Sequence, residues 1–598
     1  MRIEGVLGPR RMLVVGAVIA AVAWDPIAPA ADVKRALSLG VGVAALGLGL
    51  ARMEAGAPKP ITLPAAAAFW LGFVAWSGAS LAWGSPSGVS ALGTWAGASA
   101  LLLASRVFWR RASEARRAAS LTAAGIGGIS ALLAIAQAAG GARGLGIHGG
   151  HGNPNWLGLL LAFTLPLSID LAAALRRESA RSWALAAALS AIQVPALLLA
   201  RSRVAWAATL VAFALWAILG GVLRRGRSVA AGAVAIAILA GSAAARSEPP
   251  DLTDPTPGAQ DSPIAEAWEG RVWIWRASAD AALHELPIGA GLGEFPAAYL
   301  DAQGKRLADL PPKTASRRFL NATTAHSDWI EVAVSSGLPA LLLLAAAVIT
   351  ALAGAVRGHR PAEASAIVAF AVCAAGDSPM AQPGLVIPLA LLLGASHPDE
   401  DPDPSRKSRR AIRLPYPRVT VAIALGCVAL LLAAAVATWL GSRKLTRARE
   451  GLLPSDRIAA LTSATRLDPR SGEAALALGL ARLEAGDPTG ALADLDRSRA
   501  LLANIGTDIA IGNAHLLAGG PGAPERAASA YRRALARHPG SFRARVNLAE
   551  ALIELGALDQ ARDHLAAARS IYPGHPKLAL VAERLRKATI DAETGEPR

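Results

Sequence analysis

The sequence predicts an all-α, polytopic helical membrane protein with about 12–13 transmembrane helices, a large loop outside the membrane and a C-terminal α-solenoid. Three observations support this fold class. Of the 598 residues, 53% are hydrophobic and only 17% are charged, whereas a soluble domain averages about 25% charged residues. The apolar residues form long uninterrupted runs. After residue 446 the chain becomes rich in Ala, Leu, Arg and Asp, with helical periodicity.

Thirteen apolar runs approach the length of about 20 residues that crosses a bilayer as a helix. The first run follows an arginine-rich N-terminus and lacks a clear small-residue cleavage site, so we interpret it as a retained signal anchor. The runs centre near residues 12–30, 36–51, 62–82, 91–108, 119–140, 155–175, 182–200, 204–222, 228–245, 329–356, 363–376, 380–396 and 419–440.

Clusters of Lys and Arg predict the orientation. The net charge is +16, and on a membrane protein such an excess indicates positive-inside loops and not nucleic-acid binding. With a cytoplasmic N-terminus, every cluster falls inside, while segments 141–154, 200–204 and 246–328 and the tail fall outside. The clusters are Arg2/Arg10/Arg11, Arg52/Lys59, Arg106–Arg117, Arg176/Arg177/Arg181, Arg224/Arg225/Arg227, Arg357/Arg360 and Arg406–Arg418.

Seven arginines break this rule on the outer side. One explanation treats each of them as a helix-end side chain that snorkels toward the interface. As a set they favour a cationic site for a phosphate carried by a membrane lipid, because guanidinium offers a planar, bidentate fork to phosphate oxygens. These residues are Arg143, Arg201, Arg203, Arg271, Arg276, Arg317 and Arg318.

The tail shows an internal period of 34 residues. Pro539 and Pro573 are one period apart, and so are Ala527 and Ala561. This spacing of small and bulky residues resembles the tetratricopeptide pattern, in which stacked helix pairs form a superhelix with a concave protein-binding face. Segment 472–502 fits the same pattern, with a generic helical bundle as the alternative.

Two outer segments precede helices. Glycines followed by Asn153-Pro154-Asn155 indicate a turn into a helix that Asn155 is predicted to cap. Such a helix start presents free N–H groups to an anion, although a plain capped loop would look the same. Farther on, Arg201 and Arg203 bracket a serine at the outer start of the next but one run.

The long outer loop changes character along its length. Its first part is acidic and Pro-rich and is typical of a linker. Arg271, Trp275 and Ser278 then share one face of a predicted helix. The following glycines at 289, 291 and 293 are loosely nucleotide-like, but no strand precedes them, so we reject a dinucleotide site. His326 ends the loop at the mouth of a long helix, as either a structural histidine or a general base near neutral pH.

In this order, the motifs resemble those of the O-antigen ligase and O-antigen polymerase superfamily over about residues 60–400. The most specific likeness is His326-Ser327 followed, after nine residues, by Gly337. Ala340 stands where the ligase signature ends in Gly, Thr or Tyr, which favours a polymerase or a protein-glycosylating relative. The other matching segments are Gly152–Asn155, Arg201–Trp206, and Arg271-x-x-x-Trp275 followed by Pro287-x-Gly289-x-Gly291.

The resemblance implies a membrane domain at 1–445 with a periplasmic loop at 246–328, followed by a tetratricopeptide-repeat domain at 446–598. It implies an inner-membrane glycosyltransferase with a cytoplasmic N-terminus and periplasmic repeats. The donor is a glycan on a polyprenyl diphosphate, and the acceptor is a hydroxyl on lipid A core, on another glycan or on a protein. No metal or other cofactor is implied, and one displacement inverts the anomeric centre.

Within this resemblance, Arg203 and Arg271 would stabilise the leaving diphosphate. His326 would act as the base, oriented by Asp328, by Glu331 or by a backbone carbonyl. Substrate contacts are expected from Arg201, Arg276, Asn153, Asn155, Trp275, Arg317 and Arg318. The repeats would recruit a protein partner, so we expect transfer chemistry to survive deletion of 447–598.

Two alternatives remain open. A metal-dependent glycosyltransferase would need outer carboxylates, for which Asp25 and Asp32 are the candidates. In a non-enzymatic scaffold or polysaccharide exporter component, the repeats would bind the partner and the membrane domain would anchor them or pass substrate. A transporter should place ionisable groups at mid-bilayer, and this sequence has very few there. Two cysteines are too few for a disulfide framework or a Cys-based zinc site.

Overall fold

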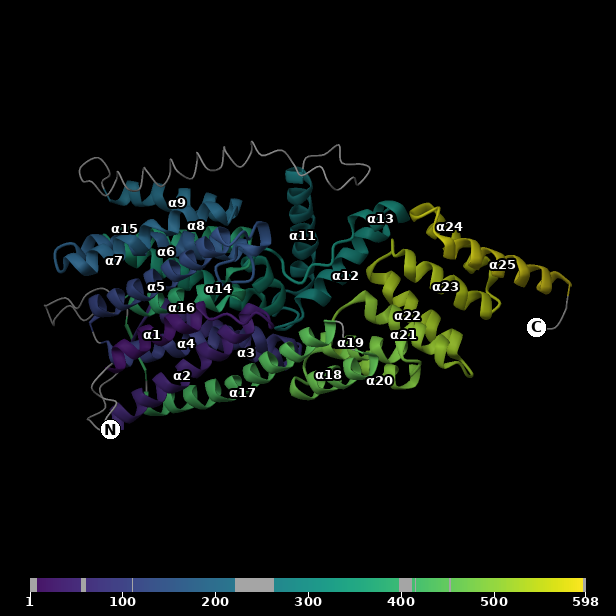
Figure 1. Cartoon of the computed structure of the whole chain (residues 1–598), viewed down its shortest axis with the longest axis horizontal. Helices are drawn as coiled ribbons and strands as arrows, with labels where there is room; N and C mark the ends of the chain where they lie inside the picture. The colour runs from purple at the N-terminus through teal and green to yellow at the C-terminus, as the bar shows by residue number, and fades with distance from the viewer. Residues whose placement is uncertain are drawn as a thin grey trace.

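A computed structural model describes residues 8–54, 61–109, 111–220, 263–396, 411–414, 416–450 and 453–594. It confirms the all-helical fold class. Figure 1 shows a helical bundle, a smaller group of helices beside it, and a helical solenoid that continues to the C-terminus.

The bundle holds α1 (Pro9–Val22), α2 (Ala30–Glu54), α3 (Ala65–Ala79), α4 (Val89–Phe108), α5 (Ala112–Ala139), α6 (Pro154–Leu175), α7 (Ala180–Ala191), α8 (Gln193–Leu199), α9 (Arg203–Leu219), α14 (Asp328–Arg357), α15 (Pro361–Gly376), α16 (Pro383–Ala395) and α17 (Pro417–Arg449). The group beside it is α11 (Pro263–Glu285), α12 (Phe295–Ala308) and α13 (Pro312–Arg318). The solenoid holds α18 (Pro454–Leu467), α19 (Gly472–Glu484), α20 (Pro488–Leu501), α21 (Ile505–Ala518), α22 (Ala523–Arg537), α23 (Phe542–Glu554), α24 (Leu558–Ile571) and α25 (Pro576–Thr594).

Within the described residues, eight helical segments are long and apolar enough to cross a membrane, and three shorter apolar helices, α9, α15 and α16, join them. The chain is therefore a multi-pass membrane protein. Each predicted run that the structure describes falls on a helix, but the first is shorter than expected because α1 ends at Val22. The run near 228–245 lies outside the described residues.

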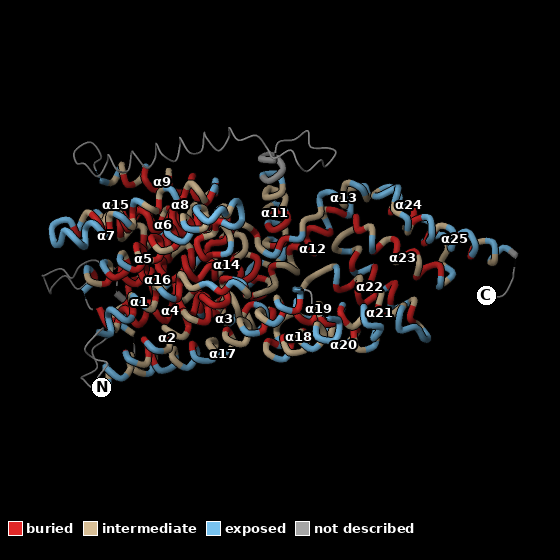
Figure 2. The backbone as a smooth tube through the Cα atoms, in the orientation of Figure 1, coloured by how far each residue is buried: buried red, intermediate tan, exposed pale blue. Residues whose placement is uncertain are grey.

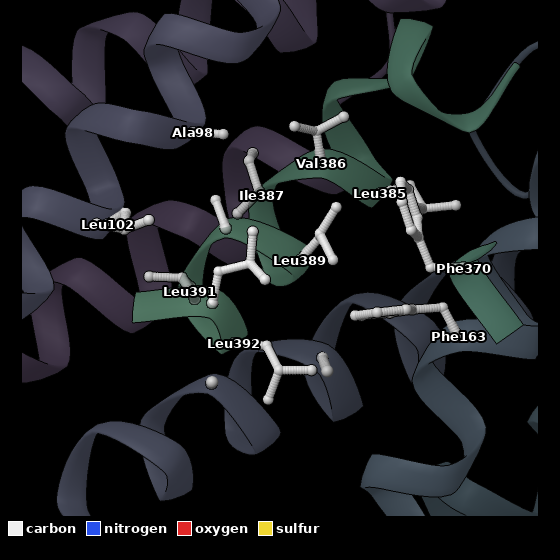
Figure 3. Packing of buried hydrophobic residues seen from close by; sticks show 14 of the residues in the cluster. Ala98, Leu102, Phe163, Phe370, Leu385, Val386, Ile387, Leu389, Leu391 and Leu392 are labelled. Carbon is white, nitrogen blue, oxygen red and sulfur yellow. The ribbon is translucent and has the colours of Figure 1, made fainter. Parts of the chain in front are cut away.

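The short helix α16 lies at the centre of the bundle. All of its residues are buried, as expected for a helix that is apolar on every face. Its leucines pack against Ala98 and Leu102 of α4, Phe163 of α6 and Phe370 of α15 (Figure 3). Figure 2 shows that buried positions concentrate inside the bundle, which makes it a rigid base for the segments at its ends.

One end of the bundle holds the basic clusters that the structure describes, such as Arg176/Arg177/Arg181 and Arg357/Arg360, whereas Arg224/Arg225/Arg227 lie outside the described residues. The strands β1 (Thr62–Pro64) and β2 (Ala411–Arg413) pair there in antiparallel register. Ion pairs tie neighbouring loops together at this end, and Arg418 Nη2 donates to the carbonyl of Met53 at 2.7 Å. The ion pairs are Arg10–Glu114, Arg116–Glu363 and Arg117–Glu178. The described clusters thus share one end of the bundle, and their cytoplasmic orientation stays a prediction.

The solenoid is built from antiparallel helix pairs. Side chains of Ser471, Asp487, Asn504 and Ser541 each accept a hydrogen bond from a backbone N–H in the first turn of the following helix, which fixes where the helices begin. The tetratricopeptide prediction placed a helix pair at 472–502, and the structure has α19 and α20 there.

A kink in α14 joins two glycine motifs that are far apart in the sequence. Gly337 has φ 73° and ψ −172° inside the helix. The turn at 287–291 fits into this kink, where Leu338 N donates to Pro287 O at 2.9 Å and Ala290 N donates to Val334 O at 2.8 Å. A Cβ atom on Gly337 would overlap the backbone of Ile288. Only glycine meets both the conformational and the spatial requirement.

We predict that Gly337→Ala destabilises the protein by about 2–4 kcal/mol, because it combines a strained positive φ with a backbone overlap. Thermal unfolding of the purified protein in detergent checks this. Gly47→Ala is the matched control, since Gly47 is helical and has no neighbouring atom within 4 Å of an added Cβ. A Gly337→Ala protein as stable as Gly47→Ala would contradict the account of the kink.

Candidate active site

His326 lies at the end of the bundle opposite the basic clusters, directly before α14. Its backbone has φ 48°, which is unusual for a non-glycine residue and is often found at functional sites. Two contacts hold this conformation. Ala325 N donates to Glu331 Oε2 at 3.0 Å, and Trp275 Nε1 donates to the carbonyl of His326 at 3.3 Å. The side chain of His326 remains 40% exposed, so the ring is accessible to a substrate.

Asp377 faces the histidine from the end of α15. Its Oδ1 lies 3.7 Å from Nδ1 of His326, and its Oδ2 lies 3.7 Å from Nη2 of Arg271. Only 6% of the Asp377 side chain is exposed, and Oδ1 also accepts a hydrogen bond from Ser378 N at 2.9 Å. Asp377 therefore stands between a basic ring and a guanidinium, and it favours Nδ1 as the protonated nitrogen of His326.

Asp377 was not among the predicted site residues, and the predicted orienting group was Asp328, Glu331 or a backbone carbonyl. In the structure these two carboxylates support the backbone. Asp328 Oδ2 accepts a hydrogen bond from Met380 N at 2.9 Å, and Glu331 holds Ala325 as described above. A signal for Asp377 was present, because it is an acidic residue at the predicted outer end of an apolar run, on the same side as the exceptional arginines.

The predicted face of α11 is turned toward this site. Arg271 reaches Asp377, Trp275 binds the His326 carbonyl, and Ser278 is fully buried one turn farther on. Trp268 packs edge-on against Trp275 with ring centroids 5.6 Å apart and stays 58% exposed. The i, i+4, i+7 spacing thus identified a face that joins α11 to the start of α14.

The start of α9 lies next to the end of α15. A Cβ atom on Gly376 would be 3.1 Å from the Val204 side chain. Arg203 directly precedes Val204 and Asp377 directly follows Gly376, so both charged residues lie next to this contact. Ser202 caps the helix through its hydroxyl, which accepts from Ala205 N. Arg203 is exposed at the first position of α9, with its charge available to a ligand at this end of the bundle.

Arg201 borders a separate hollow beside the site. It also has a left-handed backbone, with φ 49°. Together with Arg143 it lines an open cavity of about 380 Å³ whose other walls are mostly apolar. This combination suits an amphiphile with an anionic head.

Asn153, and not Asn155, caps α6. Pro154 occupies the first helical position, which makes Asn153 the N-cap, and the side-chain oxygen of Asn153 accepts a hydrogen bond from Asn155 N at 2.8 Å. The start of α6 packs on the start of α9, since a Cβ on Gly158 would lie 2.9 Å from the side chains of Ser202 and Ala205. Both asparagines therefore lie at the same end of the bundle as Arg203.

Three predicted substrate contacts are exposed arginines on α11 and α13, the helices beside the bundle. Arg276 is exposed on a face of α11 other than that of Arg271. Arg317 and Arg318 are exposed at the end of α13, where the Arg318 guanidinium carbon is 5.6 Å from the centroid of the Trp273 ring. The structure does not bring these three arginines onto Asp377.

His148 and His151, which lie in the turn before α6, do not resemble catalytic bases. His151 is buried with its Nε2 2.9 Å from the Ser130 hydroxyl. Burial, followed by the charge of Lys34, lowers the pKa of both His151 and His148, which keeps both rings neutral. His326 differs from them in its exposure and its carboxylate partner.

The carboxylates of the metal-dependent alternative are engaged elsewhere. Asp25 Oδ2 pairs with Arg443 at 2.5 Å, and Asp32 Oδ1 pairs with Arg35 at 2.9 Å. The part of the chain that the structure describes has no group of three or more His, Cys, Asp or Glu side chains placed to hold a metal ion. Asp25 therefore links the turn before α2 to α17, whereas Asp32 pairs within α2 and its Oδ2 accepts a hydrogen bond from the Ser442 hydroxyl of α17 at 2.7 Å.

Comparisons with known proteins match two kinds of domain within the chain. Residues 185–345 match the O-antigen ligase family, a range that contains Arg203, Arg271 and His326. Residues 458–503 and 520–585 match tetratricopeptide repeats. No curated protein matches the chain. Among solved structures, the crystal structure of yeast Tom70 is 11% identical, with a TM-score of 0.23 over 74% of this chain and 90% of that one.

Proposed function

We propose that this multi-pass membrane protein, with its O-antigen ligase domain and tetratricopeptide repeats, is a glycosyltransferase that moves a glycan from a polyprenyl diphosphate to a hydroxyl acceptor. The observation that carries the proposal is the meeting of Arg271, Asp377 and His326 at one end of the bundle. Two of these residues come from the matched domain, and the third faces them from α15.

The reaction is a single displacement. The acceptor oxygen attacks the anomeric carbon and forms the new glycosidic bond, while the bond from that carbon to the diphosphate oxygen breaks and its electron pair leaves with the lipid diphosphate. This attack from the opposite face inverts the anomeric centre. The acceptor hydroxyl can be on lipid A core, on a growing polysaccharide or on a protein.

His326 takes the proton of the attacking hydroxyl. With Nδ1 directed at Asp377, the other ring nitrogen, Nε2, is left to accept a proton. Asp377 stabilises the imidazolium that forms and orients the ring, although their separation of 3.7 Å must shorten when substrate binds. Asp377 is a positioning residue, while His326 touches the reacting atoms.

Arg271 and Arg203 meet the leaving diphosphate. Negative charge on the leaving oxygen grows as the sugar bond breaks, so guanidinium groups fixed beside it stabilise the transition state more than the ground state. Arg201 and Arg143 offer a neighbouring apolar hollow with two positive charges for the lipid side of the donor. No nucleotide takes part in this scheme.

The proposed location is the bacterial inner membrane. The site lies at the end opposite the basic loops, which the positive-inside trend assigns to the periplasm. The N-terminus is then cytoplasmic and the repeats are periplasmic. In that compartment, polyprenyl-linked glycans provide an activated donor without a nucleotide.

The test is transfer by the purified full-length protein in proteoliposomes that contain a polyprenyl-diphosphate glycan. Each class of acceptor is added in turn, and the glycosylated product is measured. Transfer to one class supports the proposal and identifies the acceptor. No transfer to any class, with donor and folded protein both verified, would favour the non-enzymatic scaffold.

We also predict that transfer continues at its full rate in the presence of a chelator, because arginine side chains supply the positive charge. The measurement is the initial rate with and without excess EDTA, followed by addition of Mg²⁺ or Mn²⁺. If EDTA lowered the rate and added metal restored it, this prediction would be wrong and the metal-dependent alternative would be supported.

A further inference from the structure

The repeat domain is packed closely against the helices beside the active site. α22 contacts α12, and α24 contacts α13 (Figure 1). At the turn after α22, a Cβ atom on Gly540 would overlap the backbone of Ser316 in α13. A Cβ atom on Gly304 of α12 would likewise overlap the backbone of Ala536. Glycines at both positions allow backbone-to-backbone contact.

Side chains complete this contact, which we call the docking corner (residues 536–540). Arg537 Nε donates to Asp301 Oδ1 of α12 at 2.7 Å. The His538 ring stacks on Phe319 with centroids 3.9 Å apart and planes 8° apart. Burial, helped by the charge of Arg545, lowers the pKa of His538 to about 4, so the ring is neutral at pH 7 and suited to an apolar stack.

The solenoid is held at its other end as well. α17 leads into α18, and Arg470 Nη2 donates to the carbonyl of Ala434 at 2.9 Å and to the Thr438 hydroxyl at 3.0 Å. Gly441 of α17 also lies against Asp468, whose Cβ would be 3.0 Å from a Cβ on that glycine. Because the solenoid contacts the rest of the protein at both ends, the repeats are held in a fixed position.

From the docking corner, a buried glutamine connects α12 to α11. Gln303 is fully buried, and its Oε1 accepts hydrogen bonds from Trp273 Nε1 at 3.1 Å, Tyr299 OH at 3.1 Å and Leu320 N at 2.9 Å. Arg306 of α12 adds a hydrogen bond to Asp280 of α11 at 2.8 Å. These bonds fix the placement of α11.

α11 in turn carries the residues that build the site. Trp273 lies two positions from Arg271, which faces Asp377, and two positions from Trp275, which binds the His326 carbonyl. A continuous set of contacts therefore runs from the repeats through α12 to the arginine and the histidine.

We propose that the docking corner positions the active site: by seating α12 and α13, it fixes α11 and thereby the geometry of Arg271 and His326. The proposal rests on the proposed function. It also changes the expectation for deletion of 447–598, which should now lower transfer chemistry as well as partner recruitment. Arg537, His538 and Gly540 are positioning residues and do not touch substrate.

The repeat period supplies a matched pair of variants. Gly540 and Gly574 follow Pro539 and Pro573, at equivalent places one repeat apart. An added Cβ at Gly540 meets Ser316, whereas one at Gly574 meets nothing within 4 Å. We expect Gly540→Leu to lower kcat by about 10- to 100-fold, because small displacements of catalytic groups have effects of this size, and to leave the acceptor KM unchanged. Gly574→Leu should match the wild type.

A second pair of variants guards against misfolding. Arg537→Asp should lower kcat, and the charge-swapped double variant with Asp301→Arg should restore it. Amide hydrogen exchange of α11 and α12, measured without any donor, should rise in Gly540→Leu and Arg537→Asp and return in the swap. Since this readout needs no reaction, it tests docking even if the proposed function fails.

Three results would overturn the proposal. The first is unchanged exchange in α11 for Gly540→Leu. The second is a raised acceptor KM with unchanged kcat, which would mean that the repeats only recruit the acceptor. The third is a charge swap that leaves kcat as low as the single variant. By contrast, normal transfer by His326→Ala would contradict the proposed function but would not affect the hydrogen-exchange evidence for docking.

Discussion

His326→Ala is expected to lower transfer by about 10²–10⁴-fold, the usual effect of losing a general base. The variant should stay folded, because the His326 side chain is 40% exposed and its backbone contacts remain. The measurement is the initial rate of glycan transfer in proteoliposomes, together with binding of the donor. Donor binding should be nearly unchanged, since the lost interaction forms only with the attacking hydroxyl.

The matched control is His359→Ala. His359 also has a left-handed backbone, with φ 51°, but it lies at the opposite end of α14 beside the basic loops. It should transfer at the wild-type rate. Asp377→Asn should slow transfer less than His326→Ala, and the double variant should be no slower than His326→Ala alone, because the two residues act as a unit. Full activity in His326→Ala would exclude it as the base.

The second large effect is expected at the arginines. Arg271→Ala and Arg203→Ala should each lower transfer by about 10²–10³-fold, comparable to removal of one donor from an oxyanion site. Arg271→Lys should recover only part of the rate, because an ammonium keeps the charge but not the bidentate fork. Loss of Arg271 should also remove the positive charge that lies 3.7 Å from Asp377 Oδ2.

Arg181→Ala provides the control for charge alone. Arg181 is an exposed arginine at the start of α7, at the opposite end of the bundle. Rates are compared at saturating and at limiting donor, which separates donor binding from the chemical step. If Arg271→Ala and Arg203→Ala matched Arg181→Ala, the leaving-group role of the outer arginines would be wrong.

Much of the fold could be predicted from the sequence because it rests on strong, local signals. Long apolar runs predicted the spans. The positions of Lys and Arg along the sequence predicted that the basic clusters share one end of the bundle. The face of α11 that holds Arg271 and Trp275 followed from helical spacing, and the 34-residue period predicted the repeats.

The relations that the sequence could not supply are those made by distant segments. Asp377 lies 51 residues beyond His326, and the packing of α15 against α6, α9 and α14 brings it to the site. Gly337 and Gly289 are separate motifs in the sequence, yet in the structure a Cβ atom added to either glycine would overlap the backbone nitrogen of the other. The docking corner is a third case, since nothing in Pro539-Gly540 distinguishes it from Pro573-Gly574 except the neighbour that it meets.

The most direct test of the proposed single displacement is to quantify both the glycosylated acceptor and the released lipid in one proteoliposome reaction. We expect one polyprenyl diphosphate to be released for each new glycosidic bond, with an inverted anomeric configuration by NMR and no requirement for a nucleotide. Release of polyprenyl monophosphate, or a product with the donor's anomeric configuration retained, would contradict a single displacement at the Arg271–Asp377–His326 site.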